Sequence, residues 1–397
     1  MLPLLVFSHL RWDFVFQRPQ HLMTRLARGG EVLFFEEPVR DTAPAFIEVM
    51  EPASHVKVLR PHTPVDAQGF HDDQLPVLSG LLREVLDELS MDDYCAWLYT
   101  PLAFPLLRAL EPRAVIYDCM DELSAFSEAP SQLRQREQAL MQKADIVFTG
   151  GPSLYQAKRS QHPSVYCFPS AVDVAHFAQG RDSINAHPEL RGLARPRLGF
   201  FGVVDERFDC DLLASMADAR PDWQICIVGP VVKIDEARLP RRSNIHYFGH
   251  RTYAELPAFL AGWDVCLMPF ALNEATRYIS PTKTPEYMAA DKPVVSTPVT
   301  DVIELYADLV IIATARDFVA ACERALDQTP SETALHRAAM RQRVAGISWD
   351  RTATSMARLV EAAIEAKELV ALPKLAEQAM TSSAMQPPQL NSTSAGP

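Results

Sequence analysis

The chain has 397 residues, of which 48% are hydrophobic and 22% charged, and this length exceeds what one hydrophobic core usually organises. We therefore expect a globular protein of two domains. The formal net charge of −12 argues against a nucleic-acid-binding protein, because phosphate backbones select basic surfaces.

The seven cysteines are scattered and form no C-x-x-C pair, so buried thiols are favoured over a zinc site or disulfides. The opening LPLLVFSH is too short for the apolar core of a signal peptide, and no apolar run reaches the roughly 18 residues of a transmembrane helix. We expect a cytoplasmic protein. A local basic patch that docks on the inner face of the membrane is compatible with this composition.

In the first half, short apolar runs alternate with helical patterns, which is typical of parallel βα units. These runs predict a Rossmann-like domain over residues 1–180. The predicted helices are Gln17 to Arg28, Leu75 to Leu89 and Gln132 to Lys143, and the predicted strands are LPLLVFS, EVLFFEE, CAWLYT, AVIYD, DIVFTG and VYCF.

Two segments that follow first-domain strands carry candidate site residues. Aromatic, imidazole and guanidinium groups at a strand end suit sugar stacking and hydroxyl recognition, which predicts acceptor binding for His9, Arg11, Trp12 and Arg18. Asp121 or Asp118, in YDCMDELSAF, would act as a catalytic base or orient the acceptor. A capping role before the next helix is an equally open reading of Asp121.

The second half repeats the pattern and predicts a second Rossmann-like domain over residues 195–347. The polar stretch from residue 179 to 196 is expected to be the hinge, with few core contacts. A capping box, Thr252 to Glu255, opens one helix. The predicted strands are RLGFFGVV, WQICIVG, NIHYFG, DVCLMPF, PVVST and LVIIA.

Turns after the strands of this domain offer phosphate and base contacts. Gly202 would let a phosphate approach the backbone, and the fork of donors on Arg207 would clamp a diphosphate. Phe248 and Gly249 end a strand before the capped helix. Arg207 could instead be an ordinary surface residue, and Phe248 and Gly249 could form an ordinary strand-to-helix turn.

The most informative segment is NEATRYISPTKTPEYMAADKPVVST, residues 273–297. Lys283 is a mobile charge suited to phosphate, and Glu286 can accept hydrogen bonds from the hydroxyls of a ribose. A diphosphate beside a polyol describes a nucleotide sugar. The alternative is a helix start, capped by Thr284 or Ser280, in which Glu286 only suits the helix dipole. The remaining predicted donor-binding residues are Asn273, Thr276, Ser280 and Thr282.

Residues 348–369 form a predicted helix with one apolar stripe. The stripe consists of Met356, Leu359, Val360, Ala363 and Ile364. Residues 370–397 are small, polar and proline-containing, and we expect a disordered tail.

PTKTPEYMAADKPVVST resembles the donor-binding motif of GT-B glycosyltransferases of the family 4-like group. WDFVFQRPQHL is similar to the opening of bacterial teichuronic-acid and exopolysaccharide glycosyltransferases, and PSAVDVAHF to the run that closes their first domain. The resemblance implies an α/β fold with GT-B architecture. Two Rossmann-like parallel-sheet domains would face a central cleft, and the last helix would cross back to the first domain.

The same resemblance implies transfer of a sugar from a nucleotide diphosphate sugar, such as a UDP- or GDP-sugar, to a hydroxyl of a glycan or lipid-linked saccharide. It implies retention of configuration and places the nucleobase beside Phe248 and Gly249. No D-x-D pair stands in a convincing loop of the second domain, so we expect positive side chains in place of a metal ion and no other cofactor. The expected catalytic residues are Lys283, Arg207 and Asp121. Two departures stand out, because no lysine follows Gly202 in the phosphate loop and Met120 stands where relatives have histidine. The alternatives are a nucleotide-sugar 2-epimerase on the same scaffold and a non-catalytic two-lobed sugar-binding protein. A dehydrogenase is less favoured, because no G-x-G-x-x-G follows an opening strand.

Overall fold

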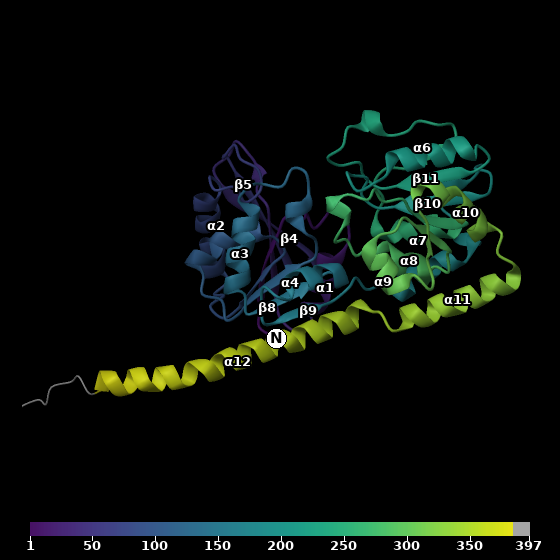
Figure 1. Ribbon diagram of the computed structural model, residues 1–397. Helices are drawn as coiled ribbons and strands as arrows, with labels where there is room; N and C mark the ends of the chain where they lie inside the picture. The colour runs from purple at the N-terminus through teal and green to yellow at the C-terminus, as the bar shows by residue number, and fades with distance from the viewer. Residues whose placement is uncertain (384–397) are drawn as a thin grey trace, which may run out of the picture.

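The computed structural model describes residues 1–383, with side chains described up to Leu369. The chain forms two α/β domains that lie side by side, with the last helix running beneath the first domain and on past it (Figure 1). The first domain is built on a nine-stranded sheet and the second on a six-stranded sheet, so the expected two-domain α/β architecture is confirmed.

The first sheet has the order β3-β5-β2-β1-β6-β7-β8-β9 and is parallel except for β4, which pairs antiparallel with β5. Its central strands are buried, as expected where helices cover both faces of a parallel sheet. The strands are β1 (Leu4–Ser8), β2 (Val32–Glu36), β3 (Val39–Arg40), β4 (Phe46–Ala53), β5 (Val56–Thr63), β6 (Cys95–Leu98), β7 (Val115–Cys119), β8 (Ile146–Thr149) and β9 (Val165–Cys167).

The β4–β5 hairpin is absent from the sequence prediction. Most of β4 is exposed, and β5 reads VKVLRPHT, in which charged residues and Pro61 break the apolar run. Strand β5 has partners on both sides, but its pairing with β2 ends at Leu59, so Pro61 lies where the β2 side of the ladder needs no N–H donor.

The second sheet is parallel throughout and has the order β12-β11-β10-β13-β14-β15. Numbered within the domain this is 3-2-1-4-5-6, the Rossmann order, so a crevice opens between the ends of β10 and β13. The strands are β10 (Arg197–Phe201), β11 (Gln224–Val228), β12 (Ile245–Tyr247), β13 (Val265–Met268), β14 (Val294–Ser296) and β15 (Ile311–Ile312).

Helices flank both sheets, and the three predicted in the first domain correspond to α1, α2 and α3. The α-helices are α1 (Arg18–Leu26), α2 (Leu75–Glu88), α3 (Leu133–Lys143), α4 (Pro152–Lys158), α5 (Val174–Phe177), α6 (Cys210–Ala219), α7 (Leu256–Gly262), α8 (Lys283–Ala289), α9 (Thr300–Tyr306), α10 (Phe318–Leu326), α11 (Pro330–Ala345) and α12 (Trp349–Ser383). The 3-10 helices are η1 (Pro101–Ala109), η2 (Leu123–Ala125), η3 (Ala178–Arg181), η4 (Ser183–Asn185), η5 (Pro188–Leu190), η6 (Glu236–Arg238), η7 (Tyr253–Glu255), η8 (Glu274–Thr276) and η9 (Ala315–Asp317). The predicted capping box is present at Thr252, where η7 leads into α7.

The last helix crosses back to the first domain, as predicted. Trp349, Met356 and Val360 are buried in the same hydrophobic cluster as Leu22 and Met23 of α1. The predicted apolar stripe therefore packs beside α1 in a core that includes strand residues of the first sheet. Among the described residues, no helix has the length and apolar character that crossing a bilayer requires.

The predicted tail needs correction. Helix α12 continues to Ser383, past the expected end at residue 369, because LPKLAEQAM consists mostly of strong helix formers. Residues 384–397, the rest of the predicted tail, lie outside the described part of the chain.

The expected hinge also differs from the prediction. Residues 178–190 form η3, η4 and η5, and Leu190 is buried in the core of the second domain. The side chain of Arg181 donates to the carbonyl of Ala289 at 2.9 Å. This stretch therefore packs on the second domain, because its few apolar residues fill the space beside α7. It is not the segment of few core contacts that the sequence predicted.

Candidate active site

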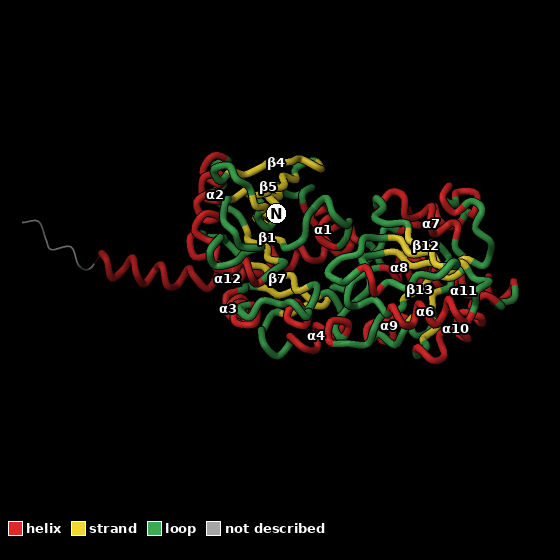
Figure 2. The backbone as a smooth tube through the Cα atoms, turned by 90° about the horizontal axis from the view of Figure 1, so that it is seen from above, coloured by secondary structure: helices red, strands yellow, loops and turns green. Residues whose placement is uncertain are grey.

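The two sheets lie on opposite sides of a seam (Figure 2), and a cleft of about 1130 Å³, open solvent included, runs between the domains. The first domain contributes to the cleft through the loops after β1, β7 and β8. The second contributes through the loops after β10, β11 and β12 and the segment before α8. The predicted residues that line the cleft are Arg18, Asp121, Gly202, Arg207, Ser280, Thr282, Lys283 and Glu286.

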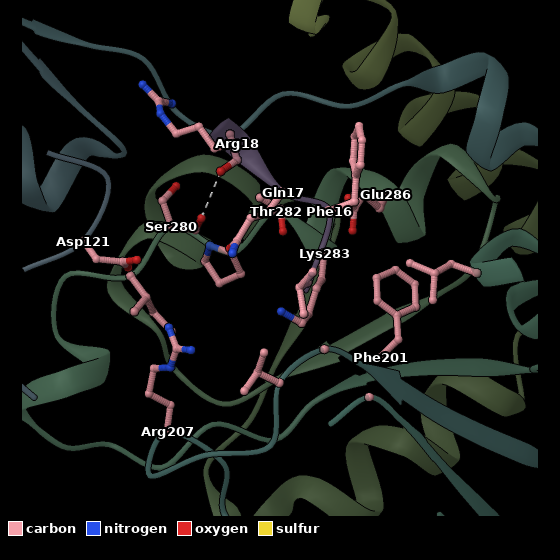
Figure 3. Close-up of a pocket in the computed structure, with 18 of the residues that line it drawn as sticks. Phe16, Gln17, Arg18, Asp121, Phe201, Arg207, Ser280, Thr282, Lys283 and Glu286 are labelled. Carbon is pink, nitrogen blue, oxygen red and sulfur yellow. Dashed lines mark hydrogen bonds between the residues drawn. The ribbon is translucent and has the colours of Figure 1, made fainter. Parts of the chain in front are cut away.

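Lys283 is the first residue of α8, and its side chain points into the cleft toward Arg207 and Asp121 (Figure 3). Its ammonium lies 5.5 Å from the ring centre of Phe200 and 6.0 Å from that of Phe270. Among the described residues it forms no salt bridge. Burial lowers the pKa of Lys283, and the charge of Arg207 lowers it further. Lys283 is therefore a buried cation whose charge an anion bound in the cleft would stabilise.

Gly202 makes room for this lysine. A Cβ on Gly202 would overlap Lys283 Cε and lie 2.7 Å from Nζ, and its φ of +138° disfavours any other residue. The backbone N–H of Gly202 donates to Val228 at 2.8 Å, so it is not free to bind a phosphate. The absence of a side chain at Gly202 thus leaves room for the Lys283 ammonium where the strand order of the sheet reverses. The sequence predicted that this room would be taken by a phosphate.

Arg207 is held by a carboxylate of its own loop. Its guanidinium donates to both oxygens of Asp205, with distances from 2.6 to 3.1 Å, and lies 5.4 Å from the ring centre of Phe126 in the first domain. These hydrogen bonds come from Nε and Nη2. The pair fixes the direction of Arg207, so Asp205 orients the guanidinium toward the cleft.

Asp121 faces these cations from the first domain (Figure 3). Burial raises the pKa of its carboxyl group, and the charge of Arg207 opposes that rise. The N-cap of the following η2 is Glu122, so Asp121 does not serve as the cap. The side chain of Glu122 is fixed by a salt bridge of 2.7 Å to the buried Lys158, which holds the loop that carries Asp121.

Glu286 lies one turn after Lys283 and is 7% exposed. Burial raises the pKa of its carboxyl group, while the charge of Lys283 lowers it. Ser280, Thr282 and Glu286 all line the cleft beside Lys283, so the segment predicted to bind the donor faces the space between the domains.

Asn273 and Thr276 are placed elsewhere, which corrects their prediction as donor contacts. Asn273 caps η8, accepting from the N–H of Thr276 at 3.1 Å, and its side-chain amide donates to Glu206 at 2.8 Å. The Thr276 hydroxyl donates to the carbonyl of Ala271 at 2.6 Å. Their polar groups are used to shape the loop.

Phe248 and Gly249 likewise do not line the cleft. The Phe248 ring packs edge-on against Phe259, with 5.3 Å between ring centres. The carbonyl of Gly249 accepts from Gly229 at 2.8 Å. The next two residues, His250 and Arg251, line the cleft in their place.

Three of the predicted acceptor residues have structural partners. Arg11 donates to the buried Glu36 at 3.1 Å, and the backbone N–H of Trp12 donates to the same carboxylate at 2.6 Å. Arg18 forms a salt bridge of 2.8 Å with Asp118, and both side chains are at most 2% exposed. These contacts hold the loop after β1 in place, and acceptor binding by Arg11, Trp12 and Arg18 stays a prediction. His9 also lies outside the cleft lining.

The same loop reaches the cleft through Val15, Phe16 and Gln17, which the sequence analysis did not select. Phe16 is 38% exposed and stacks on Tyr253 of the second domain, with 4.6 Å between ring centres. The sequence signal that could have identified Phe16 is a large aromatic residue in a loop that follows a strand. The contact joins the domains across the mouth of the cleft.

Comparison with known proteins gives this geometry a context. Residues 195–328 match the family model of group 1 glycosyl transferases. The chain is 27% identical over 277 residues, 64% of its length and 70% of the relative's, to TuaH of Bacillus subtilis (strain 168), whose name assigns it to teichuronic acid biosynthesis as a glycosyltransferase. These matches name glycosyl transfer, so the epimerase and the non-catalytic binding protein are not favoured.

Solved structures show the same fold. The sucrose-phosphate synthase of Thermosynechococcus elongatus matches with a TM-score of 0.71 at 17% identity, covering 92% of this chain and 100% of that one. Anabaena Alr3699/HepE, solved with UDP and glucose, matches with a TM-score of 0.63 at 16% identity, covering 90% of this chain and 99% of that one. The chain is a glycosyltransferase with the GT-B fold, as the resemblance implied.

Proposed function

We propose that the protein transfers a sugar from a UDP-sugar to a hydroxyl of a saccharide acceptor, with retention of configuration and without a metal ion. The observation that carries this proposal is the desolvated ammonium of Lys283, which forms no salt bridge among the described residues and shares the cleft with Arg207. Two cations that converge on one space offset the charge of a diphosphate. The choice of uridine is supported by the UDP in the HepE structure.

In the proposed reaction the bond between the anomeric carbon and the diphosphate oxygen breaks, and negative charge gathers on the diphosphate. Lys283 and Arg207 stabilise that charge where it develops. Glu286 accepts hydrogen bonds from the ribose hydroxyls. The acceptor oxygen then bonds to the anomeric carbon on the face that the diphosphate leaves, and its proton passes to a diphosphate oxygen.

Asp121 completes the proposed site from the first domain. Its carboxylate lies opposite Lys283 and Arg207, where it would accept a hydrogen bond from a sugar hydroxyl. Because it comes from the other domain, it would contribute only when the cleft is closed around the donor.

We further propose a role in cell-envelope polysaccharide synthesis, on the strength of the similarity to TuaH. An acceptor linked to a lipid would then be met at the inner face of the membrane. Sedimentation with anionic lipid vesicles tests this part separately, since a protein that stays in the supernatant at low salt makes no such contact.

Thermal-shift measurements with UDP-, GDP- and dTDP-sugars test the donor assignment. We expect UDP-sugars to raise the melting temperature most, and Lys283→Ala and Glu286→Ala to lose most of that response. An unchanged response in both variants would show that neither side chain binds the donor. NMR of the product anomer tests retention, and full activity after EDTA treatment is expected if no metal takes part.

A further inference from the structure

Two loops that face each other across the cleft make direct contact beside the donor site. One follows β7 in the first domain and carries Asp121, Phe126 and Ser127, and the other follows β10 in the second domain and carries Glu206 and Arg207. The backbone N–H of Ser127 donates to Glu206 Oε1 at 3.2 Å. The Cζ atom of Arg207 lies over the Phe126 ring, 5.4 Å from its centre. Two consecutive residues of each domain therefore meet at one of the two cations of the cleft.

The loop that carries Arg207 is fixed within its own domain. The carbonyl of Arg207 accepts from the N–H of Ala271 at 2.8 Å. The carbonyl of Glu206 accepts from the side-chain amide of Asn273, also at 2.8 Å. The backbone N–H of Arg207 donates to Asp205 Oδ1 at 3.0 Å. With the backbone held in this way, the side chain is the part of Arg207 that can adjust to a ligand.

The guanidinium of Arg207 keeps one nitrogen for a ligand. Asp205 accepts from Nε and Nη2, whereas Nη1 forms no hydrogen bond in the part of the chain that the structure describes. The side chain is 24% exposed and points into the cleft toward Asp121 (Figure 3). Asp205 and Phe126 thus hold the guanidinium from two domains and leave Nη1 for an anion in the cleft.

Phe126 acts on Arg207 through the π electrons of its ring. The face of an aromatic ring attracts a cation, and the attraction is stronger where water is kept away. Asp205 belongs to the same loop as Arg207 and stays with it however the domains move. Phe126 belongs to the other domain, so its ring reaches the guanidinium only while the domains are together.

We propose that Phe126 is a positioning residue, which holds the Arg207 guanidinium in line with the departing diphosphate when the two domains close. The hydrogen bond from Ser127 to Glu206 fixes the loop that carries the ring. The inference rests on the proposed function, since it takes Arg207 to stabilise the charge of the diphosphate. It adds that this stabilisation depends on the first domain.

Transfer kinetics with the UDP-sugar and the acceptor that the parent uses best provide the first test. Phe126→Leu keeps an apolar side chain but removes the ring, so kcat should fall about five- to tenfold, the effect of one partly desolvated cation–π contact. Phe126→Tyr keeps the ring and should retain kcat within about twofold. In an Arg207→Gln background, Phe126→Leu should lower kcat by less than about twofold, because the ring then has no cation to hold.

Phe46→Leu is the matched control, since Phe46 lies on β4 and is 42% exposed, and its kcat should equal that of the parent. Two results would overturn the assignment. One is a kcat of Phe126→Leu equal to that of the parent. The other is an equal loss of kcat in the parent and Arg207→Gln backgrounds, which would show that the ring acts through packing and not through the arginine.

NMR of the arginine side chains in the ligand-free full chain separates this inference from the proposed function. The Arg207 Nε–H signal, identified by its loss in Arg207→Gln, should shift in Phe126→Leu, because the ring current of the phenylalanine is gone. It should not shift in Phe46→Leu. If the signal shifts as expected but no transfer is ever detected, the contact between the domains stands and the proposed function fails. If transfer occurs and the signal is the same in Phe126→Leu and the parent, the positioning role is refuted.

Discussion

The glycine that faces the central lysine allows a sharp test of the site. In Gly202→Ala the new methyl group would overlap Lys283 Cε and lie 2.7 Å from Nζ. The lysine tip is flexible and would swing aside, so the clash itself is inexpensive. The backbone strain of alanine at a φ of +138° should cost about 1–3 kcal/mol of stability.

Displacement of Lys283 should cost more in catalysis than in stability. Removing one preorganised charge-stabilising group lowers kcat by about 10²- to 10³-fold, and a displaced lysine should give about 10²-fold. Gly192→Ala is a matched control, because Gly192 has a φ of +87° and a Cβ added there would meet no atom within 4 Å. Both variants should melt at lower temperature, and only Gly202→Ala should lose kcat in a UDP-sugar transfer assay. Parent-like kcat in Gly202→Ala would refute the role given to the lysine's position.

Three further outcomes concern stability. Asp118→Ala should lower the free energy of unfolding by about 3–5 kcal/mol, because it leaves Arg18 charged and 2% exposed. A denaturant midpoint equal to that of the parent would contradict a structural ion pair. Met356→Ala should lower the free energy of unfolding by about 2–5 kcal/mol if α12 is anchored on the first domain. The control Leu335→Ala, at a position 73% exposed, should lower it by under about 0.5 kcal/mol. Equal losses of stability would argue against this anchoring. Burial lowers the pKa of His21 to about 3, so between pH 6.5 and 3 the unfolded chain takes up a proton that the folded chain does not. Stability should therefore fall by about 1.4 kcal/mol for each pH unit below 6.5, and urea titrations of His21→Gln should show a shallower slope than the parent.

The sequence predicted that Lys283 and Glu286 lie together, and both line the cleft, because the signals for this segment are local. Lys283 and Glu286 lie one helical turn apart in a loop-to-helix segment, so their spacing alone places them together. The apolar stripe of α12 was equally readable, since Met356 and Val360 repeat at helical spacing and had to pack on something.

The acceptor half was harder, because partners far apart in sequence decide which side chains are free. Arg11 and Arg18 have side chains suited to sugar hydroxyls, but each forms an ion pair inside the first domain. Arg11 pairs with Glu36, 25 residues away in sequence, and Arg18 pairs with Asp118, 100 residues away. Phe16 was missed for the converse reason. Nothing local shows that an aromatic side chain of the loop after β1 will stack on Tyr253 of the other domain.

The central claim is that Lys283 stabilises the departing diphosphate. Its most direct test is the transfer rate of Lys283→Gln at saturating UDP-sugar, with Lys143→Gln, an exposed lysine at the end of α3, as control. The account predicts that kcat falls by about 10²- to 10³-fold in Lys283→Gln and is unchanged in Lys143→Gln. A Lys283→Gln enzyme that keeps its kcat, with only a higher donor KM, would show that the lysine binds the donor without taking part in the bond-breaking step.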